Sequence, residues 1–323
     1  MTIETGEKES KKSRKKTNRR KYIPNLAEFY FKPAHDWSVQ EAKRNYEQAP
    51  DKLGSLELDT IYFKDCVIGM RDIPDSSIDL VIADPPFGID FNGKSGAYNR
   101  KDDFVVSGYE EVDESYGDFT LRWMKGLPRI IAEHGSVWVF SGWNNLESIL
   151  HAARVVGLET LNHLIWKYPF GVYTRRKFVT SHYHLLLLVK NIDEYFFNKI
   201  EHYPQDVWEI KRRYRAGQRK NSTKLPLEVI ERCIDFSSKP GDVVLDPFMG
   251  NGTTAVAAKS SWRHFLGFEM NVNLKEIIGN QISSVSPGEG YTPYATRLPS
   301  VDELAEKYPK AYREYLKREG QNE

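Results

Sequence analysis

Residues 77–87 read Ser-Ile-Asp-Leu-Val-Ile-Ala-Asp-Pro-Pro-Phe, and this stretch decides the fold that we expect. The apolar run at residues 78–83 is typical of a buried parallel strand. Asp84, Pro85 and Pro86 then end the strand, because proline donates no hydrogen bond and keeps the preceding residue extended. In open α/β sheets ligands bind at the carboxyl ends of the strands, which is where these three residues are expected.

The side chains at this strand end suit an amino group on a planar ring. The Asp84 carboxylate and the Pro85 carbonyl only accept hydrogen bonds, so together they can accept both hydrogens of an exocyclic amine. Phe87 offers a flat face for a base that has been taken out of its stack. The alternative is a strand and a rigid turn in which Asp84 only caps the next segment. We treat Asp84, Pro85, Pro86 and Phe87 as candidate catalytic residues.

The composition fits one large α/β domain or two smaller ones, with 323 residues of which 40% are hydrophobic. The formal net charge is only +1, but basic residues cluster at 8–21 and again at 211–224. Such local clusters favour a polyanionic partner that approaches from one side. The first cluster also reads as a disordered, solvated tail, which is the interpretation that we favour.

The two cysteines exclude a disulfide framework and a cysteine-rich zinc site, and we expect no metal. The sequence shows no signal peptide and no apolar run long enough to span a bilayer. We therefore expect a protein that works inside the cell.

The apolar periodicity predicts strands that alternate with helices. The predicted strands are 58–63, 78–83, 135–140, 160–166, 184–190, 242–245 and 265–269. The predicted helices are 67–73, 119–132, 144–156, 226–235, 255–260 and 301–318. Asp65 follows the first strand and would lie near Asp84 if the first two strands were neighbours. The irregular segment at 92–118 is expected to be a lid or a nucleic-acid-contacting loop.

A second motif, Asp-Pro-Phe-Met-Gly-Asn-Gly-Thr-Thr at 246–254, lies between a predicted strand and a helix, and the next strand ends at Glu269. This arrangement is typical of a nucleoside-binding half of a Rossmann-like sheet. The loop lacks the full dinucleotide spacing and is not a P-loop. Asp246 would repel a pyrophosphate but suits a cationic ligand. S-adenosylmethionine fits best, with ribose hydroxyls for Glu269 and an α-amino group for Asp246.

Two basic segments with interspersed aromatic residues are candidate nucleic-acid contacts, because such segments can bind phosphates and stack on bases. The first is a predicted hairpin at 167–178, although a hairpin with ordinary solvated charges has the same pattern. The second lies within 191–222 and includes Trp208. The candidate contacts are Tyr173, Arg175, Arg176, Lys177, Lys211, Arg212, Arg213, Arg215 and Arg219.

In this order the motifs resemble the DNA methyltransferases that modify adenine N6 or cytosine N4. The catalytic motif at 84–87 precedes the cofactor loop at 246–252, which resembles the β arrangement of that family. The similarity extends over residues 58–280. Phe87 stands where the family more often has tyrosine, and His184 stands where it often has glutamate. The helix start at 221–227 keeps only Thr223 and Pro226 of the family pattern.

The resemblance implies a mostly parallel sheet with helices on both faces and S-adenosylmethionine as the cofactor. It divides the chain into a disordered tail (1–22), a lead-in segment (23–57), a catalytic half (58–190), a candidate target-recognition segment (191–222), a cofactor-binding half (223–297) and a C-terminal helix (298–323). The residues that it assigns to the cofactor are Asp65, Cys66, Asp84, Thr223, Asp246, Pro247, Phe248, Gly250, Gly252, Thr253, Thr254, Glu269 and Met270.

The implied activity is methylation of a flipped base in double-stranded DNA, most simply adenine N6, since aspartate as the first motif residue leans to adenine within the family. Cytosine N4 is the alternative. An RNA amino-methyltransferase and an inactive DNA-binding homologue are the remaining rivals. Neither Cys66 nor Cys233 follows a proline, which argues against cytosine-C5 chemistry. A homodimer and a cognate restriction endonuclease are candidate partners, and the cytoplasm or nucleoid is the expected location.

Overall fold

The computed structural model describes residues 35–86, 115–169, 173–201, 204–211 and 225–297, with a few short pieces between 305 and 317. Residues 33–299 form one compact unit, and the elements described below belong to it. Several predictions lie outside the described residues: the tail, Phe87, most of the loop at 92–118, Arg212, Arg213, Arg215, Arg219, Thr223 and most of the C-terminal helix.

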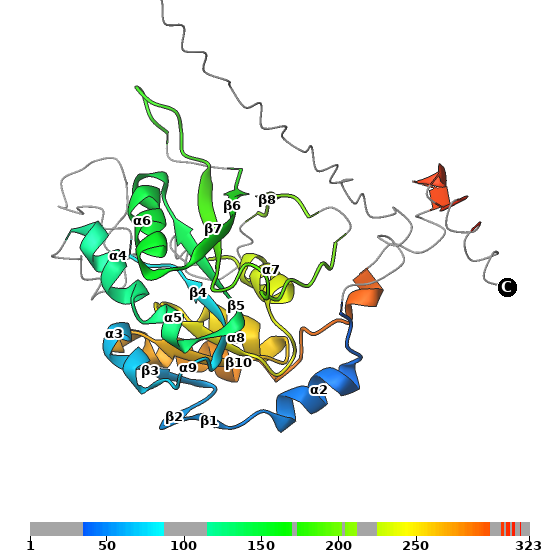
Figure 1. Ribbon diagram of the computed structural model, residues 1–323, viewed down its shortest axis with the longest axis horizontal. Coiled ribbons are helices and arrows are strands. Elements are labelled where there is room, and N and C mark those ends of the chain that lie inside the picture. The colour runs from blue at the N-terminus through cyan, green and yellow to red at the C-terminus, as the bar shows by residue number, and fades with distance from the viewer. Residues whose placement is uncertain are drawn as a thin grey trace, which may run out of the picture. The chain divides into compact units, whose positions relative to one another are not determined.

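An eight-stranded sheet organises the unit, in the order β3-β10-β9-β4-β5-β7-β6-β8 (Figure 1). The strands are β3 (Thr60–Tyr62), β4 (Ile78–Ala83), β5 (Ile131–Ser141), β6 (Glu159–Lys167), β7 (His182–Val189), β8 (Val207–Glu209), β9 (Val243–Asp246) and β10 (His264–Phe268). Within this sheet β7 is antiparallel to both neighbours, and every other pair is parallel. The predicted mostly parallel sheet is confirmed.

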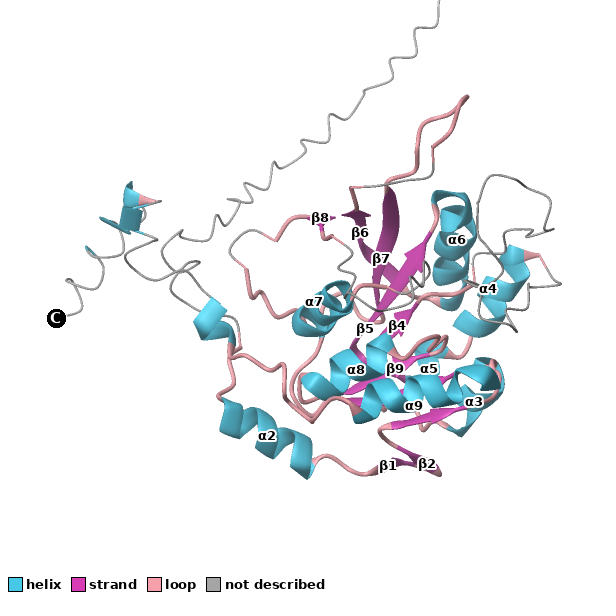
Figure 2. Cartoon of the chain, turned by 180° about the vertical axis from the view of Figure 1, so that it is seen from behind, coloured by secondary structure: helices cyan, strands magenta, loops and turns pink. Residues whose placement is uncertain are grey.

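Helices cover both faces of the sheet, as the two opposite views show (Figures 1 and 2). Alternate residues of β4 explain why: Val81 and Ala83 belong to one core cluster, and Leu80 and Ile82 belong to the other. The first cluster includes residues of α3 (Cys66–Gly69), α4 (Tyr116–Met124), α5 (Leu127–Ile130) and α6 (Leu146–Val156). The second includes residues of α7 (Leu227–Ser237) and α8 (Thr253–Ser260), and α9 (Lys275–Ser283) contacts α8. Burial on both faces accounts for the continuous apolar run in the sequence.

The helix predicted at 119–132 is partly wrong. Its first part is α4, which begins earlier, at Tyr116, where the Ser115 side chain accepts a hydrogen bond from the Asp118 amide. Pro128 then starts a separate single turn, α5, because proline has no amide hydrogen with which to continue α4. The next strand, β5, already begins at Ile131.

The lead-in segment is more regular than its sequence suggested. It contains α2 (Val39–Gln48) and a short hairpin of β1 (Lys52–Leu53) and β2 (Leu56–Glu57). Ser38 and Glu41 form a capping box at the start of α2, a local signal that the sequence carries. Among the described residues no helix is both long and apolar enough to cross a membrane.

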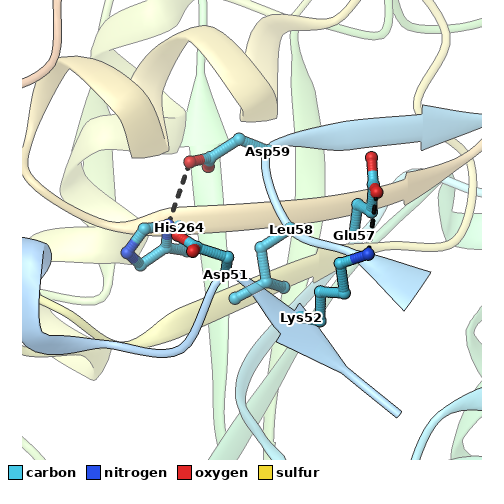
Figure 3. A pocket seen from close by; sticks show the side chains of 6 residues that line it. All are labelled: Asp51, Lys52, Glu57, Leu58, Asp59 and His264. Carbon is cyan, nitrogen blue, oxygen red and sulfur yellow. Dashed lines mark hydrogen bonds and ion pairs between the residues drawn. The ribbon is translucent and has the colours of Figure 1, made fainter. Parts of the chain in front are cut away.

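A charged histidine joins this lead-in segment to the sheet (Figure 3). His264 Nδ1 lies 2.9 Å from Asp59 Oδ2, and His264 Nε2 lies 3.0 Å from the Tyr46 carbonyl oxygen. Both partners only accept hydrogen bonds, so both ring nitrogens must carry a proton. The imidazolium stacks on the Tyr46 ring with 4.0 Å between ring centroids. Burial lowers the pKa of His264, but the Asp59 carboxylate and the Tyr46 carbonyl raise it by more.

The cavity beside this histidine, about 210 Å³ in volume, lies at the amino edge of the sheet, since Asp59 precedes β3 and His264 begins β10. Asp51, Lys52 and Glu57 also line it (Figure 3). Ligand sites of parallel sheets lie at the opposite edge. The cavity therefore marks a structural junction, and the functional site has to be sought at the carboxyl edge.

The His264 junction predicts how stability changes with pH. The folded pKa of His264 is raised above its unfolded value, so its contribution is complete below about pH 6.5 and is lost as pH rises through the folded pKa. We expect His264→Gln to lose stability at about pH 6, by roughly 1.5–3 kcal/mol, and less at about pH 8.5. Urea unfolding of both proteins at the two pH values measures this difference. An equal loss at both values would show that the imidazolium is not the stabilising species.

Candidate active site and cofactor site

Three acidic strand ends meet at the carboxyl edge of the sheet. Val81 of β4 pairs with Leu245 of β9, and Asp246 of β9 pairs with Gly267 of β10. Asp84, Asp246 and Glu269 therefore lie at the ends of adjacent parallel strands, and neighbouring strands are about 4.8 Å apart. The structure thus brings together two motifs that lie about half the chain apart in sequence.

The β4 end holds its groups in fixed positions. Ala83 and Pro85 are buried, whereas Asp84 and Pro86 are half-buried. Pro85 and Pro86 restrict the backbone, so the Asp84 backbone and the Pro85 carbonyl have little conformational freedom at this edge. Phe87, the fourth candidate catalytic residue, lies outside the described residues.

The glycine loop is tied to the acid at the end of β10. The Gly250 amide donates to Glu269 Oε2 at 2.8 Å, and the Asn271 amide donates to Glu269 Oε1 at 2.7 Å. Gly250 has φ +53° and Gly252 has φ +81°, in the left-handed region that favours glycine. A Cβ on Gly252 would lie 3.1 Å from Ile278, whereas a Cβ on Gly250 would meet only a carbonyl oxygen at 3.7 Å. Gly250 therefore leaves room for a ligand, and Gly252 allows α8 and α9 to approach closely.

Asp246 is a buried carboxyl group at the base of this loop. Its Oδ1 accepts a hydrogen bond of 2.9 Å from the Phe248 amide. Burial and, to a smaller extent, the Glu269 carboxylate raise the pKa of Asp246 to about 7, against the hydrogen bonds from Thr254 and Phe248, which lower it. Burial also raises the pKa of Glu269. Within the described residues neither carboxyl forms a salt bridge, so this site suits a cationic ligand with hydroxyl groups.

Asp65 does not lie beside Asp84, because β3 and β4 are not neighbours. β9 and β10 lie between those two strands, because the cofactor half of the chain inserts both of its strands there. Asp65 instead follows β3 next to the β10 end that carries Glu269. Its Oδ1 accepts hydrogen bonds from the amides of Val67 (2.8 Å) and Ile68 (3.2 Å), and so caps α3.

Several side chains predicted to contact the cofactor point into the core. Cys66 is 6% exposed, and burial raises the pKa of its thiol to about 12. The Phe248 ring packs edge-on against Trp123, with 5.3 Å between ring centroids. Pro247, Thr253 and Thr254 are also buried, whereas Met270 is 64% exposed directly after Glu269. Met270 is therefore the most exposed apolar side chain of this set.

His184 occupies a neutral, buried position two strands from β4. It pairs with Ser141 at the carboxyl end of β5, and its Nδ1 lies 2.7 Å from His163 Nε2. Burial, with the nearby His163 and His182, lowers the pKa of His184 to about 4. His184 is therefore a neutral imidazole at neutral pH.

The predicted DNA contacts on the first basic segment lie at the same edge as Asp84. β6 is parallel to β8 and runs in the same direction as β4 and β5, so the connection from β6 to β7 leaves the sheet at its carboxyl edge. Tyr173 is 79% exposed, and Arg175, Arg176 and Lys177 are exposed as well. The position of these residues is compatible with contact to a substrate bound over the site.

The second basic segment is only partly described, and one expectation about it is wrong. Trp208 is 5% exposed and packs on Trp138, with the Arg232 guanidinium 4.8 Å from its ring. β8 adds to the sheet edge beside β6 and thereby buries this ring, so Trp208 cannot read bases. Lys211, just after β8, is exposed.

Comparison with known proteins identifies the family of this chain. The family model described as DNA methylase, N6_N4_Mtase, matches residues 78–280, which is more than half of the chain. The type II methyltransferase M.HinfI of Haemophilus influenzae is 29% identical over 259 residues, covering 71% of this chain and 70% of that protein. The DNA adenine methyltransferase YhdJ of Escherichia coli K12 is 28% identical over 255 residues, covering 69% of this chain and 81% of that protein.

The fold is also found among solved structures. A putative DNA modification methylase of Thermus thermophilus, TTHA0409, in complex with S-adenosylmethionine, matches with a TM-score of 0.53 at 21% identity. The match covers 71% of this chain and 94% of that one. This likeness confirms the predicted methyltransferase fold. The chain belongs to the N6/N4 DNA methylase family, whose methyl donor is S-adenosylmethionine.

Proposed function

We propose that this chain methylates the N6 amino group of adenine in double-stranded DNA. The observation that carries the proposal is the meeting of Asp84 and Asp246 at the ends of adjacent strands, β4 and β9. The end of β4 offers hydrogen-bond acceptors for the amino group of the base, and the end of β9 offers a carboxylate for the cofactor. The similarity to a protein named an adenine methyltransferase supports adenine, whereas the family as a whole includes cytosine N4 chemistry.

The catalytic role falls to the β4 end. The Asp84 carboxylate and the Pro85 carbonyl accept the two amino hydrogens, which pulls the nitrogen out of conjugation with the ring and directs its lone pair outward. S-adenosylmethionine supplies a methyl carbon on a positively charged sulfur. As the nitrogen–carbon bond forms and the carbon–sulfur bond breaks, Asp84 stabilises the positive charge that develops on the nitrogen. One amino proton then leaves through the same carboxylate.

The cofactor role falls to the ends of β9 and β10. Asp246 binds the α-amino group and Glu269 binds the ribose hydroxyls, while the Gly250 backbone leaves room for both. Glu269 is held by two amides and still has free lone pairs, because a carboxylate offers about four acceptor positions. Met270, Asp65 and the backbone of Cys66 border the adenine in this arrangement, and Thr223 is assigned from the resemblance alone.

Mass spectrometry of nucleosides from treated DNA tests the proposal. The purified protein is incubated with mixed-sequence duplex DNA and S-adenosylmethionine that carries a deuterated methyl group. Labelled N6-methyladenine is the expected product. Labelled N4-methylcytosine would establish the alternative base, and labelled methyl in RNA but not in DNA would overturn the assigned substrate.

The raised pKa of Asp246 predicts how cofactor affinity depends on pH. An ammonium group binds the carboxylate and not the protonated acid, and the pKa of Asp246 in the free protein is about 7. We expect the Kd for S-adenosylmethionine to rise as pH falls below about 7, approaching tenfold per pH unit well below the pKa. Calorimetric titrations between about pH 8 and about pH 6 measure this slope. A flat profile would argue against an Asp246–ammonium contact.

A further inference from the structure

The connection between β6 and β7 exposes one aromatic ring almost completely. Phe178 is 99% exposed, in a segment whose charged residues include Arg175, Arg176 and Lys177. The Thr174 hydroxyl donates to the Lys177 carbonyl and closes a turn just before this ring. Phenylalanine is normally among the buried residues, and here no polar end of the side chain explains its exposure. A partner is therefore expected to cover it.

The base of this hairpin is rigid. The Tyr168 amide donates to the Ser181 carbonyl at 2.9 Å, which continues the pairing of β6 with β7 beyond Lys167 and His182. Trp166 stacks on Tyr183 with 5.6 Å between ring centroids and 17° between ring planes. Paired backbone and stacked rings fix the direction in which the hairpin leaves the sheet. Figure 1 shows this connection extending away from the sheet beyond β6 and β7.

The hairpin also has the reach to contact a substrate bound at Asp84. Both lie at the carboxyl edge, and β5 and β7 separate β4 from β6, which places the two about 14 Å apart along the sheet. Phe178 lies four residues before His182, where β7 begins, so an extended chain places it up to roughly 13 Å beyond the strand. This reach exceeds the depth of the major groove of a duplex, which is about 8.5 Å.

We propose that Phe178 enters the base stack of the DNA beside the target base and holds the duplex open while that base lies at Asp84. Taking a base out of the duplex leaves a gap and costs unstacking energy, and an apolar ring in the gap offsets that cost. Arg175, Arg176 and Lys177 would bind the phosphates on either side of the insertion. This inference rests on the proposed function, because it requires a duplex substrate with a flipped base.

The experiment compares two duplexes, after sequencing of methylated bases in host DNA has located the recognition site. In one duplex the target base is paired, and in the other it lies opposite an abasic position and is already free to leave the stack. Single-turnover methyl transfer is measured for the wild type, Phe178→Ala and Phe178→Trp. Val155→Ala is the control, because Val155 is 55% exposed near the end of α6 and remote from the carboxyl edge.

We expect Phe178→Ala to slow methylation of the paired duplex roughly tenfold or more, and to leave the abasic duplex nearly unaffected. Phe178→Trp should retain the rate, since a larger ring can also stack, and Val155→Ala should match the wild type. A normal rate for Phe178→Ala on the paired duplex would overturn the inference. So would an equal loss on both duplexes, which indicates a general loss of DNA binding. A lower sedimentation coefficient of Phe178→Ala than of the wild type would also overturn it, because the ring would then contact a second copy of the chain.

Failure of the proposed function gives a different pattern. In that case the wild-type protein itself methylates neither duplex, and the inference about Phe178 fails with it because no flipped base exists. When the wild type methylates both duplexes, the activity stands, and only the behaviour of the Phe178 variants decides whether this ring enters the DNA.

Discussion

Replacing Asp84 by alanine is expected to slow methyl transfer at least about 100-fold, because it removes the acceptor that stabilises the charge developing on the amino nitrogen. Affinity for S-adenosylmethionine should remain largely unchanged, since Asp246 and Glu269 are intact at the neighbouring strand ends. Single-turnover methylation and calorimetric cofactor binding measure the two effects separately.

The matched control for this prediction is Asp75→Ala. Asp75 precedes the same strand, β4, and its side chain is 75% exposed in an ion pair with Arg129. An exposed pair of this kind contributes little to stability, so the control should transfer methyl groups normally. A normal rate for Asp84→Ala would remove Asp84 from the catalytic machinery, and an equal loss in both variants would indicate a defect of folding.

The second large effect is expected for Asp246→Asn, which should weaken S-adenosylmethionine binding roughly 30-fold or more, because a buried ammonium would lose its charged partner. The substitution keeps the shape of the side chain, and the amide oxygen can still accept the hydrogen bond from Phe248. Burial already disfavours the charged form of Asp246 in the free protein, so its pKa is raised to about 7. We therefore expect the variant to unfold at no lower temperature than the wild type at neutral pH.

Asp242→Asn provides the comparison on the same strand. Asp242 precedes β9 at its amino end, where its Oδ2 accepts a hydrogen bond from the Lys239 amide. It lies at the opposite edge from the cofactor site, so cofactor affinity should not change. Unaltered affinity in Asp246→Asn would contradict the assigned role of Asp246. A matching loss in Asp242→Asn would trace the effect to the strand as a whole.

Local sequence patterns predicted most of the elements that form the site. β4 was predicted with its observed bounds because an apolar run buried on both faces, followed by two prolines, is a strong local signal. The order of β9, glycine loop, α8 and β10 was predicted from the two apolar runs that flank the glycine-bearing loop and the short helix. These elements place Asp84, Asp246 and Glu269 at the carboxyl ends of three strands. Parallel pairing of those strands then brings the three acidic residues to one edge of the sheet.

Strand order was the part that local patterns did not contain. Periodicity shows that β3 and β4 are strands but not whether they are neighbours. Because β9 and β10 separate them, Asp65 lies beside Glu269 and not beside Asp84. Trp208 was expected among DNA contacts, because nothing in its neighbourhood reveals that β8 adds to the sheet and buries the ring against Trp138. Both cases concern contacts between residues far apart in the sequence.

The exposure of individual side chains could not be predicted from the sequence either. The aromatic residues of the hairpin at 167–178 look alike as a pattern, but Tyr168 is buried against Trp166 whereas Phe178 is 99% exposed. Only the structure separates the rings that support the hairpin from the ring that is available to a partner.

The central claim is that the ends of β4 and β9 serve one reaction. Its most direct test is the binding of a bisubstrate analogue in which the N6 nitrogen of an adenine nucleoside is linked to the sulfur position of the cofactor. Calorimetry should give a lower Kd for this analogue than for S-adenosylhomocysteine, and the advantage should disappear in Asp84→Ala. Binding no tighter than that of S-adenosylhomocysteine, and indifferent to Asp84, would show that the ends of β4 and β9 do not serve one reaction.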